Sequence, residues 1–187
     1  MIKPELQITR YDAAGTLRLR ESLTALYVKT HLDQQHNPFY SPEQFWERLE
    51  TLYAPGRGFG TVVGWLDDVM VGYAFGNPRD KAQDIWDEVR SALPDVRIPE
   101  QSEPVYIFRE FAVDPRWQRH GFGRVLHDAL LGDRPEQLAH LLVRPDNIAA
   151  RFAYLSWGWR KIGEIQPFPD APVMDEMVLT LSHSTLK

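Results

Sequence analysis

One stretch decides how the whole chain is interpreted: residues 113–124 read Val-Asp-Pro-Arg-Trp-Gln-Arg-His-Gly-Phe-Gly-Arg. A β-rich run precedes it, and two glycines, Gly121 and Gly123, open an apolar helical pattern that extends to about residue 131. A helix N-terminus has unpaired backbone N–H groups and partial positive charge, and glycine lets a ligand approach closely. The stretch therefore indicates a phosphate-binding turn, although a bare Gly-x-Gly fits an ordinary glycine-rich turn equally well.

Two common phosphate-binding motifs do not match this stretch. No Lys-Ser or Lys-Thr follows the glycines, as a P-loop requires. A dinucleotide fingerprint needs a third glycine where Leu126 stands, and seven residues separate Val113 from Gly121. Asp146 lies near the place of a ribose-binding acid, but one acidic residue is weak evidence. Dinucleotide binding stays open and is not favoured.

Hydrophobic periodicity predicts an α/β fold. Expected strands are 6–11, 60–66, 69–76, 105–113, 141–143, 160–166 and 174–181, and expected helices are 16–32, 41–53, 80–92, 121–131 and 147–157. Strand–helix–strand alternation in the second half favours parallel pairing there. Asn77-Pro78 is expected to end a strand, and 77–104, rich in proline and acidic residues, is interpreted as an insertion within one domain, 1–187.

Composition narrows the class of protein. The chain has 187 residues, a net charge of −5 and no cysteine. The charge argues against nucleic-acid and membrane-surface partners, and the missing cysteine excludes disulfides, thiolate metal sites and a cysteine nucleophile. The apolar runs are too short for a membrane helix, and residues 1–5 lack the apolar segment of a secretory signal. We expect a cytoplasmic protein.

Two motifs together resemble the GCN5-related N-acetyltransferase (GNAT) superfamily. The spacing of Gln118, Gly121 and Gly123 is similar to that family's pyrophosphate-binding motif. A second signature follows at the expected distance, formed by Asn147, Ala150, Ala153, Tyr154, Gly158 and Trp159. The resemblance covers nearly the whole chain, and 77–104 exceeds the common pattern. It implies a mixed, mostly antiparallel sheet, splayed at its central parallel strands and flanked by helices.

The resemblance also implies acetyl-CoA as co-substrate. Backbone groups of Phe111 and Val113 would bind the pantetheine arm, and Asn147 would hydrogen-bond it, with helix capping as a compatible role. The pyrophosphate would rest on the amides of Gln118, Arg119, His120, Gly121, Phe122, Gly123 and Arg124. Arg119 stands where the family most often has glycine. Arg119 and Arg124 could meet phosphates or be solvated surface charges.

Tyr154 and Glu110 are the candidate catalytic residues. In the family pattern, the tyrosine hydroxyl protonates the departing thiolate, and a tyrosine at a helix start facing the sheet can do so. Glu110 lies in an apolar strand, on the face predicted for Phe108, with Arg109 pointing the other way. Burial would raise its pKa toward the range of a general base. A core tyrosine and a carboxylate paired with an arginine are the alternative interpretations.

The resulting prediction is direct acetyl transfer to a primary amine of a small molecule, with a non-catalytic acyl-CoA-binding or sensing module as the alternative. Net negative charge mildly favours a cationic amine. The region around Phe39 and Tyr40 is expected to shape the acceptor site. His31, Asp33 and His36 fit no metal-ligand spacing and are expected at the surface, so no metal is assigned. Members of the family often dimerise, which leaves a homodimer open.

Overall fold

The computed structural model describes residues 5–181, so residues 1–4, on which the leader prediction partly rests, lie outside it. The chain divides into two compact units, described separately here. The first comprises Met1–Asn77 and Phe108–Asp133, and the second Pro78–Ile107 and Arg134–Lys187. The single-domain assignment stays a prediction. Among residues 5–181, no helix combines the length and the hydropathy that crossing a membrane requires.

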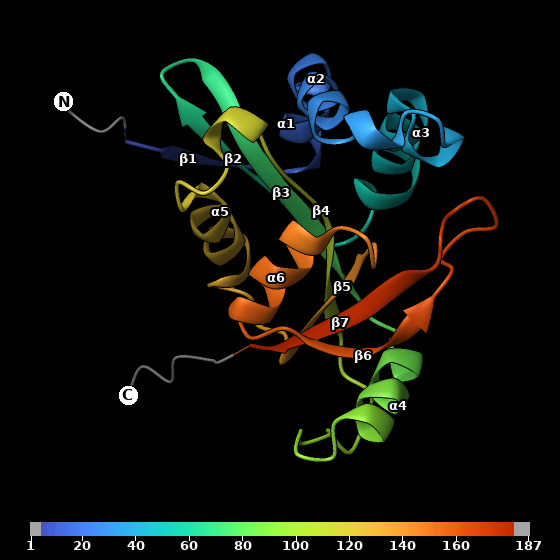
Figure 1. The fold of residues 1–187 in the computed structure, drawn as a ribbon. Helices are drawn as coiled ribbons and strands as arrows, with labels where there is room; N and C mark the ends of the chain where they lie inside the picture. The colour runs from blue at the N-terminus through green and yellow to red at the C-terminus, as the bar shows by residue number, and fades with distance from the viewer. Residues whose placement is uncertain (1–4, 182–187) are drawn as a thin grey trace. The chain divides into compact units, whose positions relative to one another are not determined.

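The strands form a mixed sheet whose hydrogen-bonded order is β1-β2-β3-β4-β5-β7-β6 (Figure 1). They are β1 (Gln7–Tyr11), β2 (Gly60–Leu66), β3 (Val69–Arg79), β4 (Val105–Val113), β5 (Leu138–Val143), β6 (Arg160–Ile165) and β7 (Met174–Thr180). The β1–β2, β2–β3, β5–β7 and β6–β7 pairs are antiparallel. β4 and β5 are parallel, with Ile107 opposite His140. This confirms the predicted fold class and one parallel pair. The parallel pairing expected between β5 and β6 is wrong, because β7 lies between them and is antiparallel to both.

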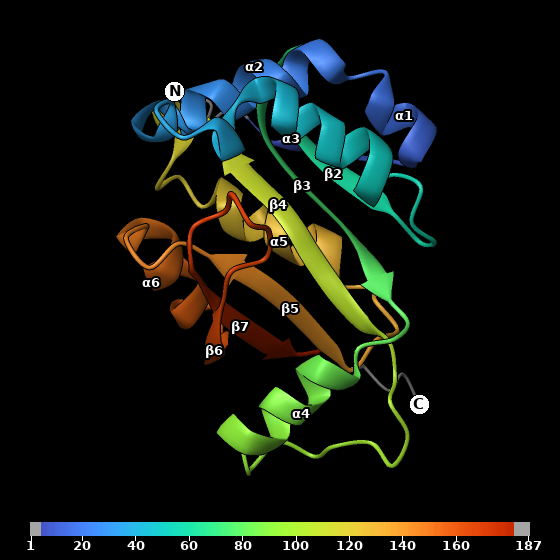
Figure 2. The same ribbon diagram turned by 90° about the vertical axis from the view of Figure 1, so that its right-hand side faces the viewer.

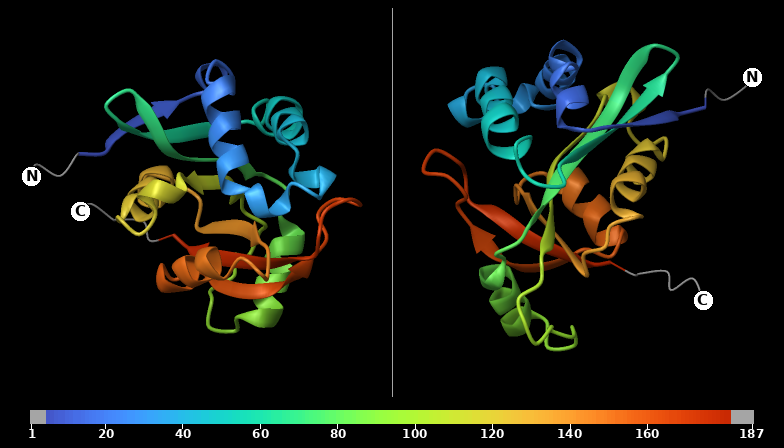
Figure 3. Two further views of the ribbon diagram at one scale, coloured as in Figure 1. Left: turned by 45° about the horizontal axis from the view of Figure 1, so that its top comes forward. Right: turned by 180° about the vertical axis from the view of Figure 1, so that it is seen from behind.

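Helices flank the β2–β3 hairpin of the first unit on both sides (Figure 3). They are α1 (Ala13–Leu17), α2 (Arg20–Thr30), α3 (Pro42–Arg48) and α5 (Phe122–Leu131). Side chains alternate along β3, so Tyr73 faces Phe45 of α3 at 6.4 Å between rings, while Gly72 faces Leu126 of α5. A Cβ on Gly72 would lie 2.9 Å from the backbone carbonyl oxygen of Ala112, which cannot move aside as the Leu126 side chain could, so this strand position requires glycine.

Two sequence predictions for the first unit need correction. The expected helix 16–32 is interrupted, because Leu19 separates α1 from α2. The alternation of β4 is also interrupted: the rings of Phe108 and Phe111 lie 5.8 Å apart, although residues three apart in a regular strand face opposite sides. Phe108 lies 5.9 Å from His127 of α5, so it does not share a face with Glu110, which interacts with Tyr73.

The second unit is built around the segment that the sequence presents as an insertion. Its helix α4 (Gln83–Ala92) packs beside β6, as Figure 2 shows. The apolar side of this segment joins the strands in one buried core of Ala82, Ile85, Trp86, Val89, Leu93, Val105, Ile107, Leu138, Ile162 and Val178. The segment therefore supplies core to this unit. The predicted end of the preceding strand at Asn77-Pro78 is wrong, because β3 continues to Arg79.

Candidate functional site

The N-terminus of α5 is open in the way the motif predicts. Gly121 is the cap residue with φ 86°, and no side chain caps the helix. By contrast, side chains of Asp12, Ser41 and Asn147 cap α1, α3 and α6. A Cβ added to Gly121 would meet no atom within 4 Å. The start of α5 thus offers backbone N–H groups beside open space, which fits a phosphate-bearing ligand.

The loop before α5 is anchored by a buried aspartate. The backbone N–H of Asp114 donates to the carbonyl of Val71 over 2.8 Å, and the side chain is 1% exposed. Its carboxylate accepts hydrogen bonds from the Arg116 guanidinium at 2.8 and 3.0 Å, and from Lys29 Nζ at 3.3 Å. The Arg116 hydrogen bonds hold the pKa of Asp114 well below its usual range. Arg116 therefore stabilises the loop through its hydrogen bonds to Asp114.

Hydrogen bonds within the loop fix two of the predicted binding residues. Gln118 Nε2 donates to the carbonyl of Val113 over 3.1 Å, which closes the loop onto the end of β4. His120 Nδ1 donates to the Gln118 carbonyl over 2.8 Å, and its ring lies 6.1 Å from the ring of Phe122. The side chain of Gln118 thus shapes the turn, while its backbone remains part of the candidate anion site.

The two arginines assigned to this loop differ. Arg124 Nε donates to Asp128 Oδ2 over 2.7 Å, one helical turn away on α5. Arg119 is exposed, and within residues 5–181 it has no ion-pair partner. It adopts φ 61°, in the left-handed region that disfavours side chains with a Cβ. Glycine adopts this left-handed conformation without strain, which explains why the family most often has glycine at this position.

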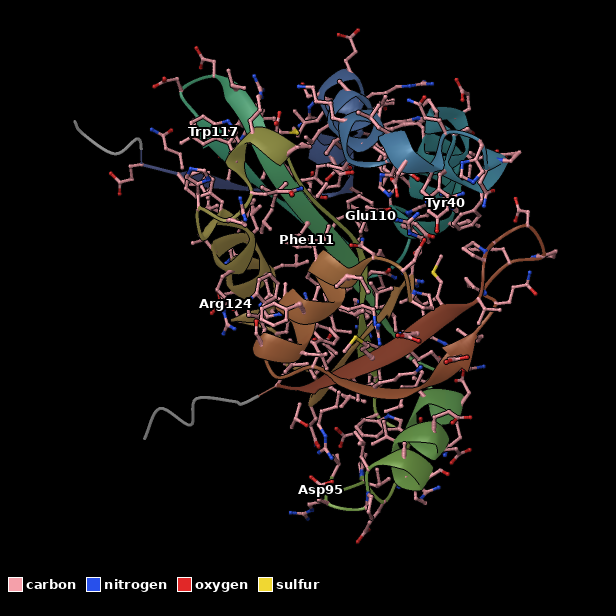
Figure 4. All side chains as sticks on the ribbon, viewed as in Figure 1. Tyr40, Asp95, Glu110, Phe111, Trp117 and Arg124 are labelled. Carbon is pink, nitrogen blue, oxygen red and sulfur yellow. The ribbon has the colours of Figure 1, made fainter. Side chains whose placement is uncertain are left out.

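Glu110 lies on β4 toward Tyr40 and the α2–α3 side of the first unit (Figure 4). It is half-buried, and burial raises its pKa, while His31 and Arg48 oppose the rise. The buried hydroxyl of Tyr73, 0% exposed, has no hydrogen-bond partner among residues 5–181. Burial, followed by the charge of Glu110, raises the pKa of Tyr73 well above its ordinary value. The Glu110 carboxylate, whose pKa is raised, therefore lies near the Tyr73 hydroxyl, which has no hydrogen-bond partner among the described residues.

Glu110 interacts electrostatically with Tyr27, His31 and Tyr73, which belong to a set of packed rings. We call Tyr27, His31, Phe39, Tyr40, Phe45 and Tyr73 the aromatic cluster. Tyr27 stacks on Phe45 at 4.1 Å and on His31 at 4.0 Å, and His31 stacks on Tyr40 at 5.4 Å. Asp33 and His36 are exposed, as predicted, whereas His31 is half-buried because its ring stacks between two tyrosines. Its Nδ1 lies 3.0 Å from the Tyr27 carbonyl. Helical spacing alone did not reveal this contact, which joins residues from different turns and loops.

Arg48 is the functional candidate that sequence reasoning missed. It ends α3, and its guanidinium carbon lies 4.2 Å from the centre of the Phe39 ring. It also lowers the pKa of Glu110 and partly offsets the rise that burial causes at Tyr27. Arg109, expected to point away from Glu110, lies 4.9 Å over Tyr53, a tyrosine that both residues influence. No sequence motif includes Arg48, and only the packing of α3 places it near Glu110 and the aromatic cluster.

In the second unit, α6 (Ile148–Ser156) carries the other candidate residues. Asn147 caps this helix, accepting from the Ala150 N–H over 3.2 Å, so its compatible capping role is confirmed. Tyr154 lies in the last turn of α6 rather than at its start, and it is 7% exposed. Its ring lies 5.9 Å from that of Trp159.

The end of α6 explains the glycine of the second motif. Gly158 adopts φ 94° and its N–H donates to the Leu155 carbonyl, while the Trp159 N–H donates to the Tyr154 carbonyl. These two bonds form a Schellman motif, which needs a left-handed residue after the helix. Arg151 Nε also pairs with Asp175 of β7 at 2.9 Å. Both contacts fix the orientation of α6 and of Tyr154 on the sheet of this unit.

Known proteins share features of both the sequence and the fold of this chain. A family model for the acetyltransferase (GNAT) family matches residues 20–159. The ribosomal-protein-S18-alanine N-acetyltransferase of Escherichia coli superposes with a TM-score of 0.62 at 18% identity, covering 98% of both chains. PH1933 of Pyrococcus horikoshii gives 0.68 at 16% identity, covering 95% of this chain and 99% of its own.

A GNAT-family acetyltransferase of Staphylococcus aureus gives a TM-score of 0.64 at 15% identity, covering 95% of this chain and all of its own (100%). At these identities the likeness concerns the fold. A search of curated protein sequences finds no significant match. Among residues 5–181, no three His, Asp or Glu side chains gather as metal ligands would.

Proposed function

The chain belongs to the acetyltransferase (GNAT) family, and from that premise we propose that it transfers an acetyl group from acetyl-CoA directly to a primary amine of a small molecule. The observation that carries the proposal is the uncapped start of α5, where Gly121 at φ 86° borders open space. A helix N-terminus of this kind binds phosphate groups through backbone N–H donors. Direct transfer follows from the absence of cysteine, which removes the usual thiol carrier of an acyl group.

On the donor side, the backbone from Gln118 to Arg124 would hold the pyrophosphate, with Arg119 adding an unpaired positive charge. Backbone groups of Phe111 and Val113 would hold the pantetheine arm. The Val113 carbonyl already accepts from Gln118, but a carbonyl oxygen has two lone pairs. Asn147 would contribute its amide while capping α6. Acetyl-CoA supplies the activated acetyl group.

On the acceptor side, Glu110 would take a proton from the ammonium group of the acceptor. Its raised pKa makes the carboxylate a better base than an exposed one. As the new C–N bond forms and the C–S bond breaks, the Tyr154 hydroxyl would deliver a proton to sulfur. The acceptor nitrogen loses two protons in all, one to Glu110 before the attack and one as the amide forms, and the second would return through water to Tyr154. The one net proton then remains on Glu110, from which it would leave to solvent.

The proposal is tested by ligand-induced stabilisation and by turnover. Acetyl-CoA should raise the melting temperature of the protein, because a ligand that binds only the folded state stabilises it. NAD should not bind and should leave the melting temperature unchanged. Turnover on an amine panel is read as released CoA thiol, with no background because the chain has no thiol. Stabilisation by NAD alone would overturn the proposal. Stabilisation by acetyl-CoA without turnover would favour the non-catalytic binding module instead.

A matched pair of glycine variants tests the binding turn. Gly121→Val should abolish stabilisation by acetyl-CoA, because a branched side chain would occupy the space beside the α5 amides. Gly58→Val is the control, since Gly58 has φ 70° and is exposed in the loop before β2. Both variants carry similar backbone strain. If both retain acetyl-CoA binding, the phosphate site lies elsewhere.

A further inference from the structure

Two groups of opposite charge lie beside the aromatic cluster, and neither has an ion-pair partner among residues 5–181. Glu110 on β4 and Arg48 at the end of α3 are both half-buried. Arg48 lowers the pKa of Glu110, so each group feels the other's charge. Within residues 5–181 neither has an ion-pair partner, and they do not pair with each other. Half-buried charges of opposite sign that lie close in a protein commonly pair, because desolvation is costly.

The surroundings of Arg48 suit it to binding an anion. Its guanidinium carbon lies over the Phe39 ring, 4.2 Å from the ring centre, and this contact restricts the side chain and reduces the entropy lost on binding. Guanidinium binds carboxylate through two parallel hydrogen bonds. Arg48 hydrogen-bonds the hydroxyls of Tyr27 and Tyr53, which are uncharged. A guanidinium has five N–H donors, so these two bonds leave donors for a carboxylate on a ligand.

A polyamine or other multiply charged cation suits this site poorly. Glu110 is the carboxylate that influences the tyrosines of the cluster, and Arg48 stands beside it with a fixed positive charge. A second ammonium group near Arg48 would be repelled by the positive charge of the guanidinium. The local charges thus oppose the cationic acceptor that the net charge of −5 favoured.

We propose that the acceptor is a small amino-acid-like molecule, whose primary amine faces Glu110 and whose carboxylate binds Arg48. The inference rests on the proposed function and adds the class of acceptor. The buried hydroxyl of Tyr73, unpartnered among residues 5–181, supplies a further polar contact for the amine end. The half-buried ring of His31 and the slightly exposed edges of Phe39 and Tyr40 would contact the acceptor's side chain.

Matched acceptors test the inference on the wild-type protein. Phenylalanine is compared with its carboxamide and with phenylethylamine, and alanine with alaninamide and ethylamine, by release of CoA thiol. The carboxylate form of each set should have a kcat/KM at least about tenfold higher, as expected for a charge-assisted hydrogen bond. Rates that are equal, or higher for the amide or amine, would overturn the inference while leaving the proposed function intact.

Variants of Arg48 then locate the preference. Arg48→Gln should raise KM for the carboxylate acceptors about tenfold or more and leave the amides and amines nearly unchanged. Arg48→Lys should show an intermediate loss, and it keeps the charge should Arg48→Gln fold poorly. Arg20→Gln is the control, because Arg20 stacks 5.0 Å over Trp46 and is exposed. An equal loss for all acceptors would overturn the inference. No thiol release with any acceptor would instead overturn the proposed function, and the inference with it.

Discussion

The backbone N–H of Trp159 donates to the carbonyl of Tyr154 over 3.0 Å, and the two rings lie 5.9 Å apart. A hydrogen bond and an edge-to-face ring contact therefore hold the proposed acid in place from the same neighbour. Gly158 makes this possible, because its φ of 94° reverses the chain directly after α6. Gly158 and Trp159, the glycine–aromatic pair of the sequence motif, therefore hold Tyr154 in position.

Gly158→Ala should destabilise the protein by about 1 kcal/mol, because alanine is strained in the left-handed region. At this chain length the melting temperature should fall by about 2–4 °C. Gly60→Ala is the control: a Cβ at Gly60 would meet its nearest neighbour at 3.8 Å, an ordinary contact, and its φ is not positive. Equal melting temperatures for the two variants would contradict the Schellman assignment.

Tyr154→Phe should reduce turnover about 100-fold, because the thiolate would leave without a proton from the protein. Stabilisation by acetyl-CoA should be nearly unchanged, since the hydroxyl acts only during transfer. Tyr11→Phe, which removes a half-buried hydroxyl at the end of β1, should behave like wild type. Turnover that survives Tyr154→Phe would remove this residue from the mechanism.

Glu110→Gln should reduce turnover by about 100-fold or more by removing the base. Wild-type turnover should fall as the pH drops through the raised pKa of Glu110, and this limb of the profile should vanish in the variant. An acid limb that persists in the residual activity of the variant would assign the titration to another group.

Glu110→Gln, which should lower turnover, should raise the stability of the folded protein at neutral pH. Between the ordinary glutamate value of 4.5 and the raised pKa, the folded chain binds more protons than the unfolded chain. Stability contributed by Glu110 therefore falls as pH rises through that window. Glu110→Gln should melt higher than wild type at neutral pH, and the difference should shrink below pH 4.5. A variant that melts lower at neutral pH would show that the carboxylate is paired.

Asp114→Asn should destabilise the protein by about 2 kcal/mol at pH 7, because it weakens hydrogen bonds from Arg116 and Lys29 to a buried carboxylate. The pKa of Asp114 is lowered, so its contribution is present above the ordinary value of 3.8 and is lost as pH falls below it. Asp84→Asn, which breaks an exposed pair with Arg79, should cost less than about 1 kcal/mol. Urea unfolding at several pH values measures both; equal costs would contradict the anchoring role.

Arg119→Gly should raise the free energy of unfolding by up to about 1 kcal/mol, because it relieves the strain of φ 61°. Arg119→Ala keeps the strain and should not stabilise. Both remove the charge, so both should weaken acetyl-CoA binding and reduce its dependence on salt by similar amounts. Binding unaffected in both variants would show that Arg119 is only a solvated surface charge.

Much of the fold follows from local patterns. The strand at 105–113 and the helix at 121–131 appear within one residue of β4 and α5, because hydrophobic periodicity and capping residues act over neighbouring positions. Ser41 caps α3 by accepting from the Gln44 N–H, as the sequence predicts. Where a prediction fails, a long-range contact overrides the local signal. The alternation of β4 breaks between Phe108 and Phe111, and periodicity carries no information about that break.

The sequence by itself determined the class of fold, the glycine turn that opens α5 and the turn that ends α6 after Tyr154, since each depends on residues a few positions apart. The tertiary structure alone decided which charges accompany Glu110. Arg48 is 62 residues away in the sequence, at the end of an ordinary helix, and no spacing rule links the two. They come together because packing of α2 and α3 against the sheet is set by the shapes of buried aromatic rings, such as Tyr27 on Phe45. That packing places opposite charges near each other, and the class of acceptor that we propose rests on these local charges rather than on the net charge.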